Sequence, residues 1–183
     1  ALPAAAQQAH PAPDRADGRV AMPAPAPLDV IFFELRGLRC ALPLAVVRKV
    51  LPMRGVTPVP LSPPVVRGVA PMHGLILPVL DLGVYFHPAG EEYSEGVGYR
   101  SSKDRLLLVE SAGDAGSESV RAALAVDRVM NIGTVDEQRS RLPPPRPPFL
   151  SATVLDTAGP ALLLDITRTI DHVKEAIGTV IGS

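Results

Sequence analysis

The side chains that could perform chemistry in this sequence are few and widely separated. Nucleophilic catalysis needs a base beside the nucleophile, and a zinc site needs ligands at short fixed spacings such as H-E-x-x-H or C-x-x-C. The sequence has neither spacing, no G-x-S-x-G nucleophile elbow and no glycine-rich phosphate loop. We therefore predict no catalytic residue, no metal and no cofactor. The isolated candidates are one cysteine and four histidines: Cys40, His10, His73, His87 and His172.

Asp81 and Asp165 are the two acids whose positions invite a catalytic interpretation. Each follows an apolar run and precedes a segment with helical spacing. A carboxylate there can accept hydrogen bonds from the exposed amides of the first helical turn. Since neither acid has a candidate base or metal ligand nearby in the sequence, we interpret both as helix caps. Cys40 alternates with apolar residues and is interpreted as a core thiol.

The composition excludes several partner classes. The chain has 183 residues, 18 basic and 19 acidic, so its net charge of -1 gives no pull toward nucleic acid or an anionic membrane. No apolar run approaches the ~18 residues that span a bilayer, so membrane insertion is not expected. A single cysteine cannot form an intrachain disulfide, which favours a reducing, cytoplasmic setting.

Residues 1–27 differ from the rest of the sequence. They are rich in Ala and Pro, have few large apolar residues and show no period. Such a segment cannot bury enough surface to offset chain entropy, so we predict a disordered leader followed by one folded domain over 28–183. The leader lacks the basic start and apolar core of a signal peptide. Met22 could be the translation start, and whether the leader has a function is left open.

From Leu28 onward, short apolar runs alternate with turn residues, which predicts an all-β fold of about ten strands. A loop over 87–103 would separate two sub-barrels, and a weak repeat supports that division: L-P-V-L-D-L at 77–82 and L-L-L-D-I at 162–166. Helices are predicted over 45–51, 82–86 and 166–181, the last with an apolar face. The predicted strands are 31–35, 38–44, a short extended 56–59, 65–72, 75–80, 105–109, a bent 120–135, 150–155 and 161–164.

Five short motifs, in order, resemble the CheW family of chemotaxis coupling proteins over 28–183. The family's V-R-E-V turn, assigned here to the helix over 45–51, and its G-x-x-N-x-R-G signature are both recognisable with substitutions. The matching segments are Phe33-Glu34-Leu35, Val47-Arg48-Lys49-Val50, Thr57-Pro58-Val59-Pro60, Gly68 to Gly74 with Pro78-Val79-Leu80-Asp81-Leu82, and Val126-Asp127-Arg128-Val129.

The resemblance implies two intertwined five-stranded SH3-like β-barrels around a shared core, with a C-terminal helix. It also implies a non-catalytic adaptor that joins a methyl-accepting chemoreceptor tip to the regulatory domain of a CheA-type histidine kinase. Family members bind the kinase through barrel ends and receptors through a groove between barrels. The partner-binding residues expected from this resemblance are Val47, Arg48, Lys49, Met72, His73, Asp127 and Arg128.

Two departures from the family pattern concern receptor binding. Lys49 stands where the family often has an acid, and Pro71 and His73 stand where it has Asn and Arg. We hypothesise that the receptor differs from the usual one in charge; drift in a weakly used surface is the alternative. Asp127 and Arg128 could form a salt-bridged bend or a kinase contact.

Other interpretations stay open at this stage. The chain could be a divergent paralogue that serves a motility or other non-standard array and binds one partner only. The segment 141–146, R-L-P-P-P-R, could be a polyproline ligand or a stiff loop. A small hydrolase or metal enzyme would instead require a deep pocket that gathers His73 with carboxylates.

Overall fold

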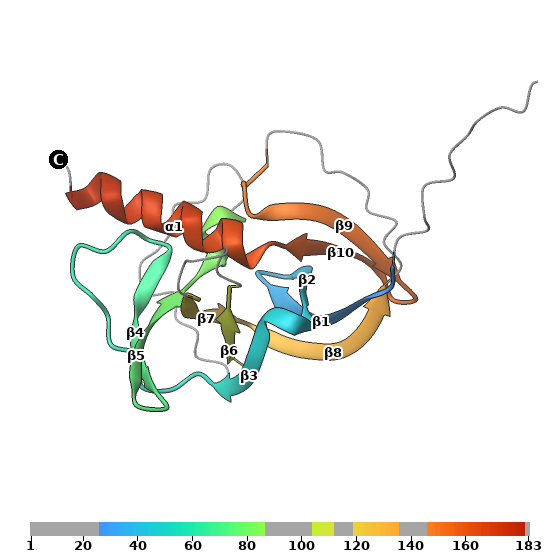
Figure 1. Cartoon of the computed structure of the whole chain (residues 1–183), viewed down its shortest axis with the longest axis horizontal. Helices are drawn as coiled ribbons and strands as arrows, with labels where there is room; N and C mark the ends of the chain where they lie inside the picture. The colour runs from blue at the N-terminus through green and yellow to red at the C-terminus, as the bar shows by residue number, and fades with distance from the viewer. Residues whose placement is uncertain (1–25, 87–103, 112–118, 136–145, 182–183) are drawn as a thin grey trace, which may run out of the picture.

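The computed structural model describes residues 26–86, 104–111, 119–135 and 146–181, which form ten strands, two short 3-10 helices and one long helix (Figure 1). Sheet A has the strand order β8 (Arg128–Val135), β1 (Leu28–Leu35), β2 (Leu38–Pro43), β10 (Gly159–Leu164) and β9 (Leu150–Asp156). Sheet B has the order β3 (Val47–Pro52), β6 (Arg105–Glu110), β7 (Arg121–Val126), β5 (Leu75–Leu80) and β4 (Val66–Met72). The 3-10 helices are Leu44–Val46 and Leu82–Tyr85, and the long helix is α1 (Ile166–Ile181).

The two sheets are built to one plan. Each has an edge strand, an antiparallel hairpin, a parallel contact and a second hairpin; the parallel contacts are β2 with β10 and β5 with β7. The chain enters sheet A, passes to sheet B at β3 and returns at β8, so sheet B is contiguous in sequence and sheet A is made of two separate segments. The predicted all-β class, two five-stranded units and C-terminal helix are confirmed.

A sequence repeat underlies this plan, and the backbone hydrogen bonds make it explicit. The Leu150 amide donates to the Pro147 carbonyl at 3.1 Å, as the Val66 amide does to Pro63 at 2.8 Å. The amides of Asp81 and Asp165 each donate at 2.8 Å to a carbonyl at the start of the preceding hairpin, those of Val65 and Phe149. The strand-then-cap repeat that the sequence suggested therefore corresponds to equivalent positions in the two sheets.

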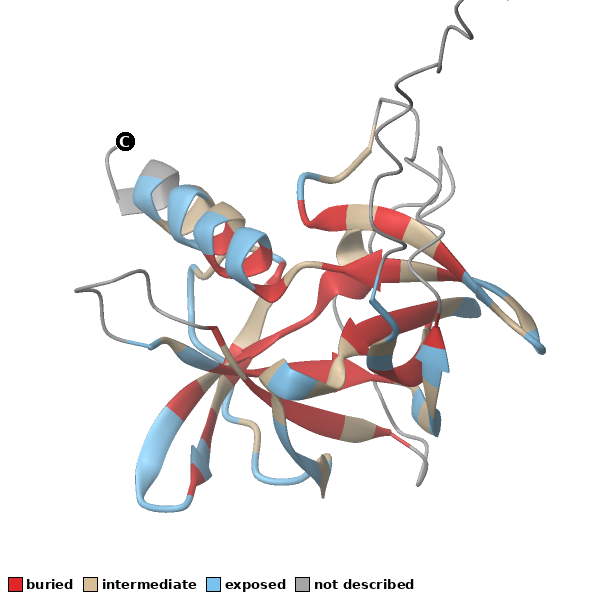
Figure 2. Cartoon of the chain, turned by 45° about the vertical axis from the view of Figure 1, so that its right-hand side comes forward, coloured by how far each residue is buried: buried red, intermediate tan, exposed pale blue. Residues whose placement is uncertain are grey.

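Strands β1, β6 and β7 are among those with apolar side chains buried on both faces. Alternate residues of each enter a central cluster shared by both sheets and α1, and the residues between them enter a smaller cluster within their own sheet. This explains their continuous apolar sequences, because a strand buried on both faces shows no polar alternation. Figure 2 shows the buried residues gathered on these strands, with the β4–β5 hairpin tip exposed.

The caps and the C-terminal helix follow the sequence prediction. Asp165 accepts a hydrogen bond from the Arg168 amide at 3.1 Å, and Asp81 accepts one from the Gly83 amide at 2.9 Å. Along α1, the residues at helical spacing that enter the central cluster are Ile166, Ile170 and Val173. Cys40 is fully buried, and burial, followed by the charge of Asp127, raises the pKa of its thiol to about 12.

Two predicted elements were wrong. The helix over 45–51 is a single 3-10 turn followed by strand β3, because the edge of β6 offers a hydrogen-bonding partner that seven residues of isolated helix cannot match. The β-branched Val47 and Val50 also favour the strand. The single bent strand over 120–135 is two strands, since the chain leaves sheet B after Val126 and enters sheet A at Arg128.

Several predictions lie outside the described residues. They are the leader, apart from its last two residues, the junction over 87–103, nearly all of the turn over 112–119 and most of the proline-rich segment that begins at 141. Closure of each sheet into an SH3-like barrel stays a prediction.

A buried carboxylate links the two sheets. Asp81 has no solvent exposure, and its Oδ2 lies 3.5 Å from Arg67 of β4 and 4.0 Å from Arg36 of the β1–β2 turn. Arg36 also donates its backbone amide to Asp127 at 2.6 Å. The buried carboxylate of Asp81 is therefore paired with one cation from each sheet.

Replacing Asp81 by Asn should lower the free energy of unfolding by about 1–3 kcal/mol, since two partly buried arginines, 27% and 23% exposed, lose their counter-charge. Urea denaturation near neutral pH would measure the change. The matched control is Asp29→Asn, an exposed carboxylate on β1, which should change stability by less than about 0.5 kcal/mol. Equal effects of the two substitutions would contradict the role of Asp81.

Candidate partner-binding surface

Sheet B carries a cavity of about 250 Å³ beside the β4–β5 hairpin. Its apolar floor comes from β4, β5 and β6, and its charged rim from the ends of β3, β6 and β7. We define the candidate surface as the residues that line this cavity together with Lys49, which contacts one of them. The lining residues are Arg48, Met72, His73, Leu75, Leu77, Leu108, Glu110 and Arg121.

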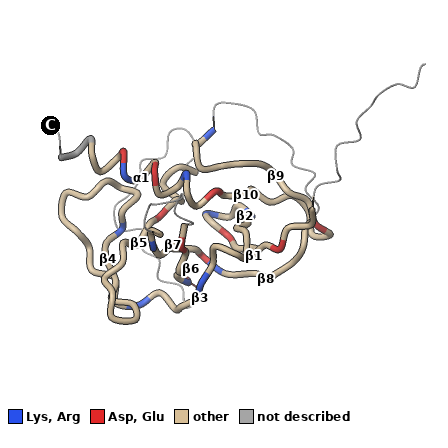
Figure 3. Tube along the Cα trace, viewed as in Figure 1, with Lys and Arg blue, Asp and Glu red and all other residues tan. Residues whose placement is uncertain are grey.

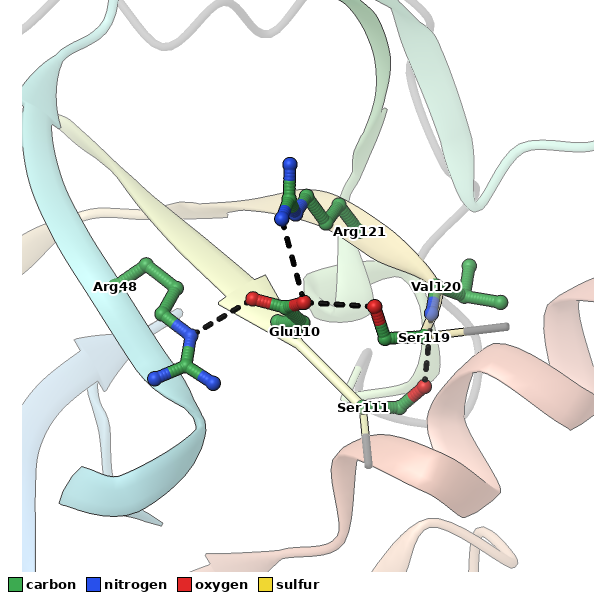
Figure 4. Close-up of polar contacts among 6 residues, drawn as sticks. All are labelled: Arg48, Glu110, Ser111, Ser119, Val120 and Arg121. Atoms are coloured by element: carbon green, nitrogen blue, oxygen red, sulfur yellow. Dashed lines mark hydrogen bonds and ion pairs between the residues drawn. The ribbon is translucent and has the colours of Figure 1, made fainter. Parts of the chain in front are cut away.

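Glu110 organises the rim of the candidate surface (Figure 4). Its carboxylate accepts hydrogen bonds from the Ser119 hydroxyl at 2.7 Å, from Arg48 Nε at 2.8 Å and from Arg121 Nη2 at 3.4 Å. These bonds, led by Ser119 and Arg48, lower the pKa of Glu110 to about 2. The carboxylate is therefore ionised at neutral pH and holds both arginines in place.

A β-bulge places Arg48 on this rim. The register of β3 against β6 shifts between Val47, opposite Val109, and Lys49, opposite Leu108. Arg48 is the extra residue, and a bulge of this kind re-aims a side chain away from its regular direction. Arg48 and Lys49 are consecutive in the sequence, and Figure 3 marks this part of β3 as basic.

His73 and Lys49 contact each other across the surface. His73 and Gly74 form the two-residue turn between β4 and β5 with φ of 51° and 79°, the left-handed pair typical of a tight hairpin. Lys49 Nζ lies 3.2 Å from His73 Nε2. Because an ammonium group can only donate, Nε2 is the acceptor when this hydrogen bond forms. The two departures from the family pattern at these positions are therefore neighbours in space.

The structure brings together four of the seven sequence-predicted site residues: Arg48, Lys49, Met72 and His73. Val47 is half-buried and packs against the central cluster. Sequence reasoning missed Glu110 and Arg121, which sit at the ends of paired apolar strands. Only the register that places them opposite each other reveals their common role.

Asp127 and Arg128 lie at the crossing from β7 to β8 and line no part of this cavity. Asp127 accepts the Arg36 amide and donates its own amide to the Glu34 carbonyl at 3.0 Å. Burial raises the pKa of Asp127. Arg128 pairs with Glu34 at 2.8 Å. These contacts make a salt-bridged bend; a kinase contact at this place stays a prediction.

The equivalent position in sheet A holds an arginine whose charge is paired. Arg39 stands opposite Glu34 as Arg121 stands opposite Glu110, and Asp156 begins the hairpin turn where Met72 does in sheet B. The Arg39 guanidinium lies 4.0 Å from the centre of the Phe32 ring and pairs with Asp156 at 2.6 Å. A hollow of about 220 Å³ remains beside Arg39, but the charge that borders it is already paired.

The arrangement is unsuited to acid–base catalysis. His73 and Glu110 share the cavity, as the hydrolase interpretation required, but a carboxylate with a pKa of about 2 is a weak base at neutral pH. The described part of the chain contains no group of three His, Cys, Asp or Glu side chains able to hold a metal ion. An apolar floor with a charged rim is instead typical of a protein-binding surface.

Comparison with known proteins agrees with this geometry. The family model for the CheW-like domain matches residues 29–174. The chain belongs to the CheW family.

A solved structure has the same fold. The scaffolding protein TtCheW from Thermoanaerobacter tengcongensis superimposes with a TM-score of 0.61 and 23% sequence identity, over 78% of this chain and 86% of that one. At that identity the likeness shows the fold alone. No curated protein sequence matches the chain significantly.

Membership of the CheW family makes this chain a chemotaxis scaffold or adaptor without catalytic activity of its own. The resemblance inferred from five short motifs is thereby confirmed. Within the described residues, no helix has both the length and the apolar character needed to cross a membrane.

The ion pairs of Glu110 should make stability depend on pH. The folded-state pKa of about 2 lies below the ordinary value of 4.5, so the stabilisation is fully present above pH 4.5 and is lost as pH falls toward 2. The difference in unfolding free energy between wild type and Glu110→Gln should therefore be constant from pH 7 to about 5 and narrow below it. Urea titrations at each pH would measure it. Ser119→Ala should reduce the pH-dependent part, and a difference that stays constant down to pH 3 would contradict this account.

Proposed function

We propose that this CheW-family chain couples a chemoreceptor to a CheA-type histidine kinase, and that the candidate surface of sheet B binds the receptor tip. The observation that carries this proposal is the contrast between the sheets. In sheet B the candidate surface is a cavity with an apolar floor and a rim of half-exposed cations, whereas in sheet A the arginine beside a hollow of similar size is paired with Asp156. Cations that stay available beside an apolar floor, on one sheet, suit a binding surface for one partner.

The exposed residues of the β4–β5 hairpin support this assignment. Leu75 is 46% exposed and Ile76 75% exposed, and Leu75 also lines the cavity. Apolar side chains held at a rigid turn, beside a rim of ordered charges, form the core-and-rim pattern of a protein interface. Burying them against a partner would release water from both surfaces.

The kinase side of the adaptor is assigned to sheet A. Its β8 edge exposes Met130 at 40% and Ile132 at 61%, close to the Asp127–Arg128 crossing. An exposed edge strand with apolar side chains is a natural docking element. Both partners place the adaptor in the cytoplasm, and no chemistry is required of it.

A divergent paralogue that binds only one partner is the second candidate. The substitutions at Lys49 and His73 favour it, because both lie on the candidate surface, in contact with each other. In that case the kinase would bind and the receptor would not.

Binding of the full chain to each partner from its own organism tests the proposal. Titration calorimetry should detect saturable binding of both the kinase regulatory domain and a cytoplasmic receptor fragment. Leu75→Ser should weaken receptor binding about tenfold, because it removes apolar contact at the centre of the surface, and should leave kinase binding unchanged.

The matched control is Leu155→Ser, which replaces an aliphatic side chain that is 57% exposed on β9 of sheet A. Receptor affinity should survive this change. Kinase binding without receptor binding by the wild type would favour the single-partner paralogue, and binding of neither by a folded chain would overturn the adaptor proposal.

A further inference from the structure

The charges of the candidate surface do not balance. Arg48, Lys49 and Arg121 are cationic, and Glu110 is the one carboxylate among the described residues that form the surface. Glu110 accepts hydrogen bonds from both arginines, so its negative charge is already paired within the surface. The result is a net positive rim around an apolar floor.

Both arginines keep donors for a partner. The side chains of Arg48 and Arg121 are 54% and 48% exposed, and each uses a single nitrogen to bond Glu110. A guanidinium carries five N–H groups in a fixed plane, so most of these donors stay directed to solvent. Glu110 orients two cationic groups that can still bind a carboxylate.

Of the three cations of the candidate surface, Lys49 is the one with no counter-ion in the described part of the chain. Its contact is Nε2 of His73 at 3.2 Å, which can accept a hydrogen bond from the ammonium group but carries no carboxylate charge. The imidazole thereby fixes the position of the ammonium group on the rim. The acid that the family pattern often has at this position would instead repel an acidic partner.

We propose that the candidate surface selects a receptor segment that carries an aliphatic side chain next to carboxylates, and that Lys49 determines this preference. The aliphatic side chain occupies the 250 Å³ cavity over Leu77 and Leu108, while the carboxylates pair with Lys49 and the arginines. A basic segment would face repulsion from three cations. This inference rests on the proposed function, because it names the chemistry of the receptor segment.

The test is a charge-reversal cycle with the full chain and the cytoplasmic signalling fragment of a chemoreceptor from the same organism. The chain variants are Lys49→Glu and, as a control with the same charge change, Lys174→Glu on the exposed side of α1. The receptor variants replace each Asp and Glu of the tip, one at a time, by Asn or Gln. Titration calorimetry measures the dissociation constant of every pair.

Lys49→Glu should weaken receptor binding about tenfold, and Lys174→Glu should not. With the wild-type chain, one receptor variant that has Asn or Gln in place of an acid should also bind about tenfold more weakly than the unchanged receptor. With the Lys49→Glu chain, the same receptor variant should bind little more weakly than the unchanged receptor does, because both changes remove the same ion pair. Replacing that receptor acid by Lys should restore binding to Lys49→Glu.

The outcomes separate this inference from the proposed function. Receptor binding that Lys49→Glu leaves unchanged or strengthens, or that Lys174→Glu weakens equally, would overturn the selection of acidic segments while the adaptor role stands. Absence of receptor binding by a wild-type chain that still binds the kinase domain would overturn the proposed receptor contact, and this inference with it.

Discussion

The sharing of one apolar core by two sheets constrains everything else in this molecule. Strands β1, β6 and β7 bury side chains on both faces, so no functional group can lie along their length without being desolvated. The charged and hydrogen-bonding side chains of the candidate surface therefore lie at strand ends, edges and turns. Glu110 and Arg121 lie at strand ends, Arg48 at a bulge in an edge strand, and His73 in a turn. Among the described residues, the one carboxylate with no solvent exposure is Asp81, and it is paired with a cation from each sheet.

The two halves show how one backbone plan supports different surfaces. Equivalent positions carry Arg39 with Asp156 in sheet A and Arg121 with Met72 in sheet B. The acid in sheet A gives its arginine an internal partner. The methionine in sheet B cannot do so, and the arginine turns to Glu110. A single difference in side-chain charge at a hairpin turn thus accompanies the difference between a paired arginine and a half-exposed one, beside hollows of similar size.

Much of the fold could be predicted from the sequence, because hairpin turns and helix caps are local signals. The His73-Gly74 turn and the caps at Asp81 and Asp165 depend on residues within a few positions of each other. Strand β3 could not be predicted in this way, since its apolar spacing fits a helix and only the distant β6 decides the outcome. The Glu110 cluster was missed for the same reason. It joins residues whose proximity depends on register, which no single sequence reveals.

The order of strands in sheet A bears on how the chain acquires its structure during synthesis. The first hairpin, β1 and β2, pairs with β8 on one side and with β10 on the other. Strands β8 and β10 are synthesised late, so the hairpin leaves the ribosome with two unpaired edges. These edges stay unpaired until most of the chain has been synthesised. Sheet B, in contrast, needs nothing beyond β7. Sheet B can therefore form first and serve as a template, while the nascent β1–β2 hairpin is the segment most in need of protection from aggregation.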